Sequence, residues 1–322
     1  MLTALPFPRS KMLVLNAKTS ADQILANKDL SDKLVIVTGA NAGIGFETAR
    51  SLASAGAHVI FACRSATTGQ AAVNKTRQLH PNCQVEFIPL DLASASSIVE
   101  FSAKLDTDKI DILICNAGLI ATDYQQTQEG LEQTVGVCHF GHFLLTTLLM
   151  PRLLNALESR VVMVSSEAHR SPKTLDFSRF PLSADTFGTW SAYGQAKLAN
   201  VLMANELQRR YGKQGLSACS LHPGTLVTTE IGRGSAFMRI MMKLISPLTK
   251  NANQGAATTV YCAVESNPRK IAGLYFSHCQ PAAMSTEAAD ETVAQKLWAL
   301  SEEWAQKTIA ANHPSHPSHP SH

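Results

Sequence analysis

The sequence is poor in charge, in aromatic residues and in paired cysteines. Of its 322 residues, 16% are charged and 6% are aromatic, and the net charge is only +3. So small a charge argues against a nucleic-acid partner. Seven scattered cysteines without a C-x-x-C pair argue against a disulfide framework and a zinc site, and are typical of a reduced, intracellular chain. No apolar run reaches the length that spans a bilayer, so we expect a cytoplasmic protein.

The two ends of the chain lack the pattern of a folded domain. We expect residues 1–32 to be a lead-in. Met1–Ser20 carries basic but no acidic residues, so an organelle-targeting segment is the alternative to a loosely ordered one. Ala21–Lys28 is predicted to form a short helix capped by Ser20. Residues 312–322 contain only His, Pro and Ser after Asn312, which predicts a disordered, solvated tail rather than a metal site.

A glycine-rich turn follows the first apolar run. Leu34–Thr38 reads as a strand, and Phe46–Ala55 reads as a helix. Gly39 permits the sharp turn, Gly43 lets the backbone approach phosphates, and Gly45 lets the helix pack close to the strand. This geometry places backbone N–H groups and a helix N-terminus against a pyrophosphate. The predicted dinucleotide contacts are Gly39, Asn41, Gly43, Ile44 and Gly45.

Apolar strands then alternate with helical patterns, without a repeat or a composition shift. Nearly continuous apolar strands separated by helices indicate a parallel sheet covered on both faces. We predict one Rossmann-type, doubly wound α/β domain, residues 33–311, with about seven strands. Further strands are expected at His58–Cys63, Val85–Leu90, Ile110–Cys115, Arg160–Val164, Leu216–Leu221 and Gly273–Phe276. Helices are expected at Ser65–Leu79, Ser94–Leu105, Gly130–Leu149 (stopped by Pro151), Ser191–Tyr211 and Gln254–Val264.

The second strand bears on the choice of cofactor. Enzymes that use NAD usually place an acidic residue near the end of this strand, to bind the ribose diol. No acidic residue stands between Glu47 and Glu86, and the strand instead ends at Arg64. A guanidinium suits a 2′-phosphate, whereas the alternative is an ordinary surface arginine. The sequence therefore predicts NADP(H).

Tyr193 and Lys197 stand four residues apart in a predicted helix. This spacing puts both side chains on one face. A free phenol ionises only near pH ~10, and a neighbouring ammonium favours the phenolate. Tyr193 is therefore a candidate general acid or base for carbonyl reduction or alcohol oxidation. Ser165 and Ser166 follow the fifth strand, at the edge where open α/β sheets bind ligands, and supply a hydroxyl for the substrate oxygen.

Short motifs follow three of the other predicted strands. These are Asp91-Leu92, Asn116-Ala117-Gly118 and Pro223-Gly224. Together with the glycine turn, Ser166, Tyr193 and Lys197, their order and spacing resemble the short-chain dehydrogenase/reductase family over about residues 33–305.

The resemblance assigns expected roles to these residues. It implies that Asp91, next to Leu92, contacts the adenine, and that Asn116, Ala117 and Gly118 support the sheet behind the cofactor. It implies that Ser166, not Ser165, orients the substrate carbonyl. It further implies that Lys197 reaches the nicotinamide ribose. The residues expected to border the nicotinamide are Pro223, Gly224 and Thr228.

Longer stretches resemble one branch of that family, the retinol dehydrogenases and the WW domain-containing oxidoreductases. These stretches are Gly45–Ala49, Ala62–Arg64, Ser165–Arg170, Leu175–Phe177, Gln254–Thr259 and Leu297–Glu302. One position departs from the family pattern, since Cys138 stands where the family has an asparagine. That asparagine shapes the helix so that a backbone carbonyl holds a relay water. A thiol is a weak hydrogen-bonding group and does not replace an amide.

Residues 229–250 are expected to cover the substrate as a lid. Residues 231–248 combine an apolar stripe at helical spacing with basic neighbours. Core packing explains such a stripe, but so does a cover for a lipid-like substrate or a peripheral contact with a membrane. We therefore expect an NADP(H)-dependent oxidoreductase, active as a homodimer on an apolar carbonyl or alcohol. The alternative is a cofactor-binding scaffold or sensor with weak turnover, motivated by Cys138.

Overall fold

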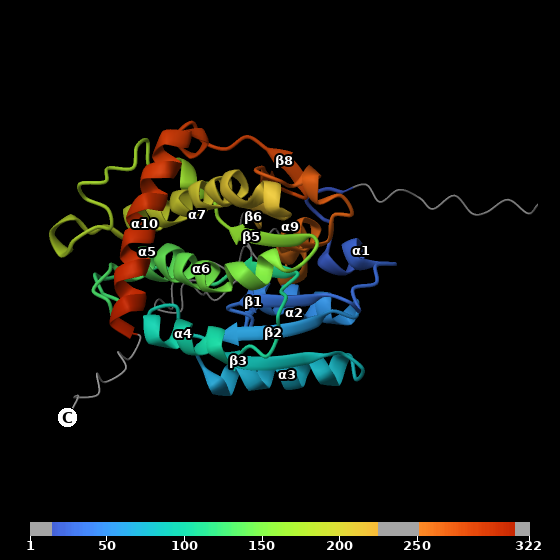
Figure 1. The fold of residues 1–322 in the computed structure, drawn as a ribbon. Helices are drawn as coiled ribbons and strands as arrows, with labels where there is room; N and C mark the ends of the chain where they lie inside the picture. The colour runs from blue at the N-terminus through green and yellow to red at the C-terminus, as the bar shows by residue number, and fades with distance from the viewer. Residues whose placement is uncertain (1–14, 225–250, 313–322) are drawn as a thin grey trace, which may run out of the picture.

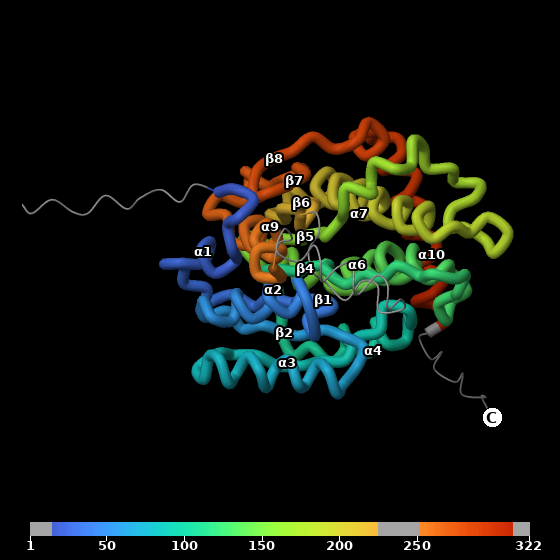
Figure 2. Tube along the Cα trace, turned by 180° about the vertical axis from the view of Figure 1, so that it is seen from behind, coloured from blue at the N-terminus to red at the C-terminus, as the bar shows by residue number. Residues whose placement is uncertain are grey.

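The computed structural model describes residues 15–224 and 251–312, and this part of the chain forms one eight-stranded sheet. The strand order is β3-β2-β1-β4-β5-β6-β7-β8. The first seven strands pair in parallel, and β8 pairs antiparallel with β7. Figure 2 shows the labelled strands following one another from β8 to β2. The bounds are β1 (Leu34–Thr38), β2 (His58–Cys63), β3 (Val85–Pro89), β4 (Ile112–Cys115), β5 (Ser159–Val164), β6 (Leu216–His222), β7 (Tyr275–Ser277) and β8 (Gln280–Ala282).

Helices cover both faces of the sheet because successive strand residues point to opposite sides. In β1, Val35 and Val37 join one core, whereas Leu34 and Ile36 join the other. The first core also holds side chains of α1, α2, α3 and α9, and the second holds those of α4, α6 and α7. These helices are α1 (Ala21–Leu25), α2 (Gly43–Ser54), α3 (Ala66–Leu79), α4 (Ala95–Lys104), α6 (Gly141–Leu154), α7 (Thr189–Tyr211) and α9 (Ala252–Val264).

The predicted doubly wound sheet is confirmed, and the differences lie at its margins. The strand expected from Ile110 begins at Ile112, because Ile110 donates its N–H to Arg152 at the end of α6. The sequence did not predict β8, which is only three residues long, is mostly exposed and has Pro281 as its middle residue. It also did not predict helix α10 (Glu291–Asn312), which crosses α7, α6 and α4 on the outside of the domain (Figure 1).

The helix expected at Gly130–Leu149 has different ends and an interruption. It begins later, as α5 (Gln133–Val135), because Gly130 has φ +79° and the Glu132 carboxylate caps the first turn. A π-helical turn, Gly136–Phe140, separates α5 from α6. Pro151 does not stop α6, which continues through it to Leu154, and the Pro151 carbonyl still accepts the Asn155 N–H at 3.1 Å. The Gln133–Leu154 stretch is apolar enough to cross a membrane, but 83% of its most apolar window is buried inside the protein, as in a core helix.

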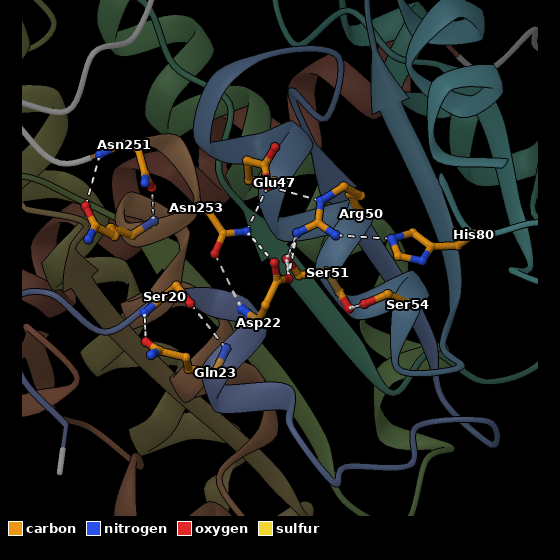
Figure 3. Close-up of polar contacts among 11 residues, drawn as sticks. Ser20, Asp22, Gln23, Glu47, Arg50, Ser51, Ser54, His80, Asn251 and Asn253 are labelled. Carbon is orange, nitrogen blue, oxygen red and sulfur yellow. Dashed lines mark hydrogen bonds and ion pairs between the residues drawn. The ribbon is translucent and has the colours of Figure 1, made fainter. Parts of the chain in front are cut away.

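Helix α1 fastens the described part of the N-terminal segment to the domain. Ser20 caps it, as predicted, in a reciprocal capping box with Gln23. Asp22 accepts a hydrogen bond from Arg50 of α2 at 2.6 Å, and Asn253 of α9 donates to Asp22 at 3.2 Å (Figure 3). The Arg50 guanidinium is largely buried and also binds Glu47 at 3.0 Å. Helix α1 is therefore packed against α2 and α9.

Replacing Asp22 with Asn removes one of the two carboxylates that bind the buried Arg50 guanidinium. Partial burial opposes ionisation of Asp22, but hydrogen bonds from Arg50 and Ser51 outweigh it and hold the pKa of the carboxyl below its usual value. Since the Asp22 side chain is 55% exposed, water screens the pair, and we expect a loss of only about 1–2 kcal/mol in the free energy of unfolding at pH 7. Urea denaturation measures it.

The pH dependence of that loss follows from the lowered pKa. The stabilisation is complete above the carboxyl pKa of the unfolded chain, about 4, and disappears as the pH falls through the folded value. The free energies of unfolding of the wild type and of Asp22→Asn should therefore become equal at low pH. Asp106→Asn is the control, because exposed Asp106 makes no ion pair or hydrogen bond with the described residues. Equal losses for both variants would contradict the assignment.

Candidate active site

The order of the strands places a crevice-forming junction between β1 and β4. The chain leaves β1 toward β2 on one side and returns to β4 on the other, so the loops after these strands diverge. Ligands of open α/β sheets bind at such a point, beyond the carboxyl ends of the strands. The residues singled out from the sequence follow β1, β2, β3, β4, β5 and β6 at this same edge.

The glycine turn after β1 has the shape that a pyrophosphate requires. Gly39 and Gly43 have φ of +66° and +56°, which favour glycine. A Cβ on Gly45 would overlap the Gly39 carbonyl oxygen and the Asn116 side-chain nitrogen, so only glycine fits there. The N-cap of α2 is Ala42, which has no side chain to bind the first N–H groups of the helix. Those N–H groups suit a phosphate, and the turn therefore fits a dinucleotide.

Thr38 fastens the loop after β4 to the end of β1. Its Oγ1 accepts the backbone N–H groups of Asn116 and Ala117, both at 2.9 Å. The Asn116 side chain returns a hydrogen bond to the Thr38 carbonyl at 2.8 Å. These contacts hold the two sides of the junction together.

The ends of β2 and β3 carry the expected adenosine-side residues. Arg64 is exposed, and its side chain has no hydrogen bond or ion pair with any described residue. Beside it, Ser65 caps α3, and Asn41 donates to Thr68 at 3.3 Å, which joins the glycine turn to the first turn of α3. Asp91 accepts the Ala93 N–H at 3.0 Å. Leu92, which follows Asp91 in the predicted adenine-side motif, is buried.

The two serines after β5 have different environments. Ser165 is 2% exposed and donates its hydroxyl to the Lys197 carbonyl at 2.7 Å. Ser166 is partly exposed and caps the 3-10 turn Glu167–Arg170, where its Oγ accepts the Ala168 N–H at 3.2 Å. The Ser166 hydroxyl proton therefore stays available to a ligand, whereas that of Ser165 is used within the protein.

Tyr193 and Lys197 lie on the same face of α7, as predicted. Lys197 is 4% exposed, and its ammonium lies 5.6 Å from the centroid of the Tyr193 ring. It donates to the Val164 carbonyl at the end of β5, at 3.1 Å. Helix α7 packs against the turn that Ser166 caps, so the structure brings the elements of all three side chains together.

Cys138 lies in the π-helical turn next to Lys197. A Cβ on Gly118 would stand 3.2 Å from the Cys138 sulfur and 3.3 Å from the Lys197 nitrogen, so these groups surround one point. The Cys138 thiol points to the Leu119 carbonyl at 3.8 Å, and the Cys138 carbonyl binds His142 Nδ1 at 2.9 Å. The carbonyl that the family pattern uses is therefore held by a histidine four residues later.

The tautomer of His142 follows from its partners. Burial lowers its pKa to about 4, and the Lys197 cation adds to this effect, so the ring is neutral at pH 7. Nδ1 faces a carbonyl, which only accepts, and must carry the proton. Nε2 therefore accepts from the Thr38 hydroxyl, 2.9 Å away. One neutral ring thus connects the Thr38 junction to the Cys138 carbonyl.

His142 and His169 were not among the predicted site residues. His169 binds the Ser166 carbonyl at 2.7 Å through Nδ1 and accepts the Ser285 N–H at 3.2 Å through Nε2. The four-residue spacing from Cys138 to His142 was a usable signal. The contact between His169 and residue 285 joins distant parts of the chain, and no local pattern reveals it.

The remaining predicted residues follow β6. Pro223 is partly exposed, and Gly224 is buried with φ +120°. Thr228 and the expected lid, residues 229–250, lie outside the described residues.

A glycine turn at a sheet junction, with a tyrosine, a lysine and a serine beside it, defines a dinucleotide-binding oxidoreductase. Residues 33–178 match the family model of the short chain dehydrogenases. The WW domain-containing oxidoreductase of Danio rerio is 42% identical over 300 residues, which cover 91% of this chain and 73% of that protein. Human retinol dehydrogenase 12 is 40% identical over 279 residues, which cover 86% of this chain and 87% of that protein. The chain therefore belongs to the short-chain dehydrogenase family, in the branch of the retinol dehydrogenases.

A solved structure shares the fold at lower identity. A short chain dehydrogenase from Escherichia coli, complexed with NADPH, superposes with a TM-score of 0.62 at 22% identity. The similarity covers 78% of this chain and 98% of that one. At this identity the likeness extends to the architecture alone.

The two serines provide a matched pair of substitutions. We expect Ser166→Ala to lower kcat with a carbonyl substrate by about a hundredfold to a thousandfold, because it removes a donor to the substrate oxygen. We expect Ser165→Ala to lower the free energy of unfolding by about 1 kcal/mol, because it removes a buried hydrogen bond. Steady-state kinetics and urea denaturation of both variants measure the two effects. A larger loss of kcat in Ser165→Ala would reverse the assignment.

Proposed function

We propose that this protein is an NADP(H)-dependent oxidoreductase that interconverts the carbonyl and alcohol forms of an apolar substrate. The observation that carries the proposal is the buried Lys197 ammonium, 5.6 Å from the centroid of the Tyr193 ring. Lys197 binds the Val164 carbonyl at the carboxyl end of β5, and α7 packs against the turn that Ser166 caps. When bound, the nicotinamide supplies or accepts the hydride.

Tyr193 is the proposed proton donor to a carbonyl, or acceptor from an alcohol. The Lys197 charge offsets the negative charge that develops on Tyr193 during donation, because the ammonium lies 5.6 Å from the centroid of the Tyr193 ring. The Val164 carbonyl holds that ammonium in place. Ser166 orients the substrate oxygen, since its hydroxyl proton is not used within the protein.

Arg64 is the proposed partner of the cofactor's 2′-phosphate. Its exposed guanidinium stands at the end of β2 without a carboxylate nearby in the sequence. The Asn41 amide donates to the Thr68 hydroxyl at 3.3 Å and so joins the glycine turn to α3, the helix that follows Arg64. A guanidinium at this place favours NADP(H) over NAD(H).

An apolar substrate is proposed from the sequence of residues 231–248 and from the retinol dehydrogenases among the relatives. A homodimer and a peripheral membrane contact through 231–248 are part of the same proposal. The direct test is consumption of NADPH with a panel of aldehydes, ketones and quinones. Turnover of apolar carbonyls supports the proposal, whereas tight NADPH binding without any turnover would indicate a cofactor-binding scaffold.

Replacing Tyr193 with Phe removes the proton donor and keeps the ring. We expect NADPH to bind with an unchanged Kd, and kcat to fall by about two to four decades, which is the usual contribution of a general acid or base. Fluorescence titration and steady-state kinetics measure these quantities. Wild-type turnover in Tyr193→Phe would exclude the role.

Replacing Arg64 with Asp tests the choice of cofactor. The change removes the phosphate partner and adds a repulsive charge, so we expect the Kd for NADPH to rise far more than the Kd for NADH. Lys213→Asp is the control for net charge, because exposed Lys213 lies before β6, at the opposite edge of the sheet. Equal weakening of both cofactors in Arg64→Asp would contradict the assignment.

A further inference from the structure

Trp190 exposes a large apolar ring next to the proposed proton donor. It is 69% exposed, and among the described residues no other tryptophan or phenylalanine is largely exposed. An exposed aromatic ring is informative, because burying an indole ordinarily contributes strongly to stability. The Trp190 and Tyr193 rings meet edge to face, with centroids 6.3 Å apart and planes at 77°.

Trp190, Tyr193 and Lys197 form a stripe that runs from the surface into the protein. Their spacing of three and four residues places them on one face of α7. Along the stripe the exposure falls from 69% at Trp190, through the half-buried Tyr193, to 4% at Lys197. A carbonyl group that reaches Tyr193 therefore has its remaining atoms on the outer side, where Trp190 stands.

The start of α7 is fixed to the loop after β4. Thr189 donates its hydroxyl to the Thr122 carbonyl at 3.2 Å. Tyr124 follows Thr122 by two residues and Phe187 precedes Thr189 by two, and their rings pack edge to face with centroids 5.9 Å apart. These contacts hold the backbone that carries Trp190, so the indole has a defined position relative to Tyr193.

We propose that Trp190 is a specificity-determining residue, and that the apolar chain of the substrate lies against its indole ring. The substrate class is a carbonyl compound with an apolar chain several carbons long. This inference rests on the proposed function, because it takes Tyr193 as the group that exchanges a proton with the substrate oxygen. A purely structural role for Trp190 would affect folding but not the preference for chain length.

The kinetic test is kcat/KM for straight-chain aldehydes of rising length, at saturating NADPH. Each methylene that leaves water should raise kcat/KM by up to about fourfold. We expect Trp190→Ala to lower the ratio of kcat/KM between the longest and the shortest aldehyde by about tenfold, mainly through KM. Trp190→Phe keeps an aromatic face and should keep the ratio within about threefold of wild type.

Leu157→Ala is the matched control for loss of an exposed apolar side chain. Leu157 is 95% exposed and precedes β5, at the opposite edge of the sheet, so its substitution should leave the ratio unchanged. An unchanged ratio in Trp190→Ala would overturn the inference. Absence of turnover for every aldehyde in the wild-type protein would instead be a failure of the proposed function.

A binding measurement tests Trp190 without turnover. Trp298 is buried and Trp304 is partly buried, so the fluorescence that acrylamide quenches readily comes mainly from Trp190. Decanamide, an unreactive amide with a long apolar chain, should reduce acrylamide quenching of the wild-type protein in the presence of NADP⁺. The same addition should have little effect on Trp190→Phe. Equal quenching of the wild type with and without bound decanamide would overturn the inference.

Discussion

The Thr38 hydroxyl joins three elements at the point where the sheet reverses its strand order. It accepts two backbone N–H groups from the loop after β4 and stands 2.9 Å from His142 of α6. Its own strand leads directly into the glycine turn. An apolar side chain of the same shape has no lone pairs, and would leave buried N–H groups unpaired. The dinucleotide side and the Lys197 side of the site therefore depend on one residue for their relative position.

The end of β5 carries a second set of constraints. The Val164 carbonyl accepts from both Lys197 and Asn200, and the Ser165 hydroxyl donates back to the Lys197 carbonyl. Burying an ammonium is costly unless its protons have partners. Here the hydrogen bonds that satisfy Lys197 also fix α7 against β5. The Ser165 hydroxyl is used in this contact, whereas the hydroxyl proton of the neighbouring Ser166 is not used in the bond that its oxygen accepts from Ala168.

The sequence predicts the strands of the parallel sheet and the glycine turn, because burial on both faces leaves continuous apolar runs and a φ above zero demands glycine. It also predicts that Tyr193 and Lys197 share one face of a helix, because residues four apart in a helix lie on the same side. It does not predict α10 or the contact of His169 with Ser285, since both depend on packing between segments that are distant in the sequence. Nor does it predict the π-helical turn at Cys138, whose shape is set by neighbours in three dimensions.

His142 and His169 hold backbone groups of the site while their rings remain uncharged. Each ring donates from Nδ1 to a backbone carbonyl, at Cys138 and at Ser166, and each accepts at Nε2 from a neutral donor. Burial lowers the pKa of both, and the nearby Lys197 cation opposes a charge on His142. A lysine or arginine in either place would compete with Lys197 for any phenolate and repel it. Neutral imidazoles therefore hold the Cys138 and Ser166 carbonyls without adding a positive charge beside them.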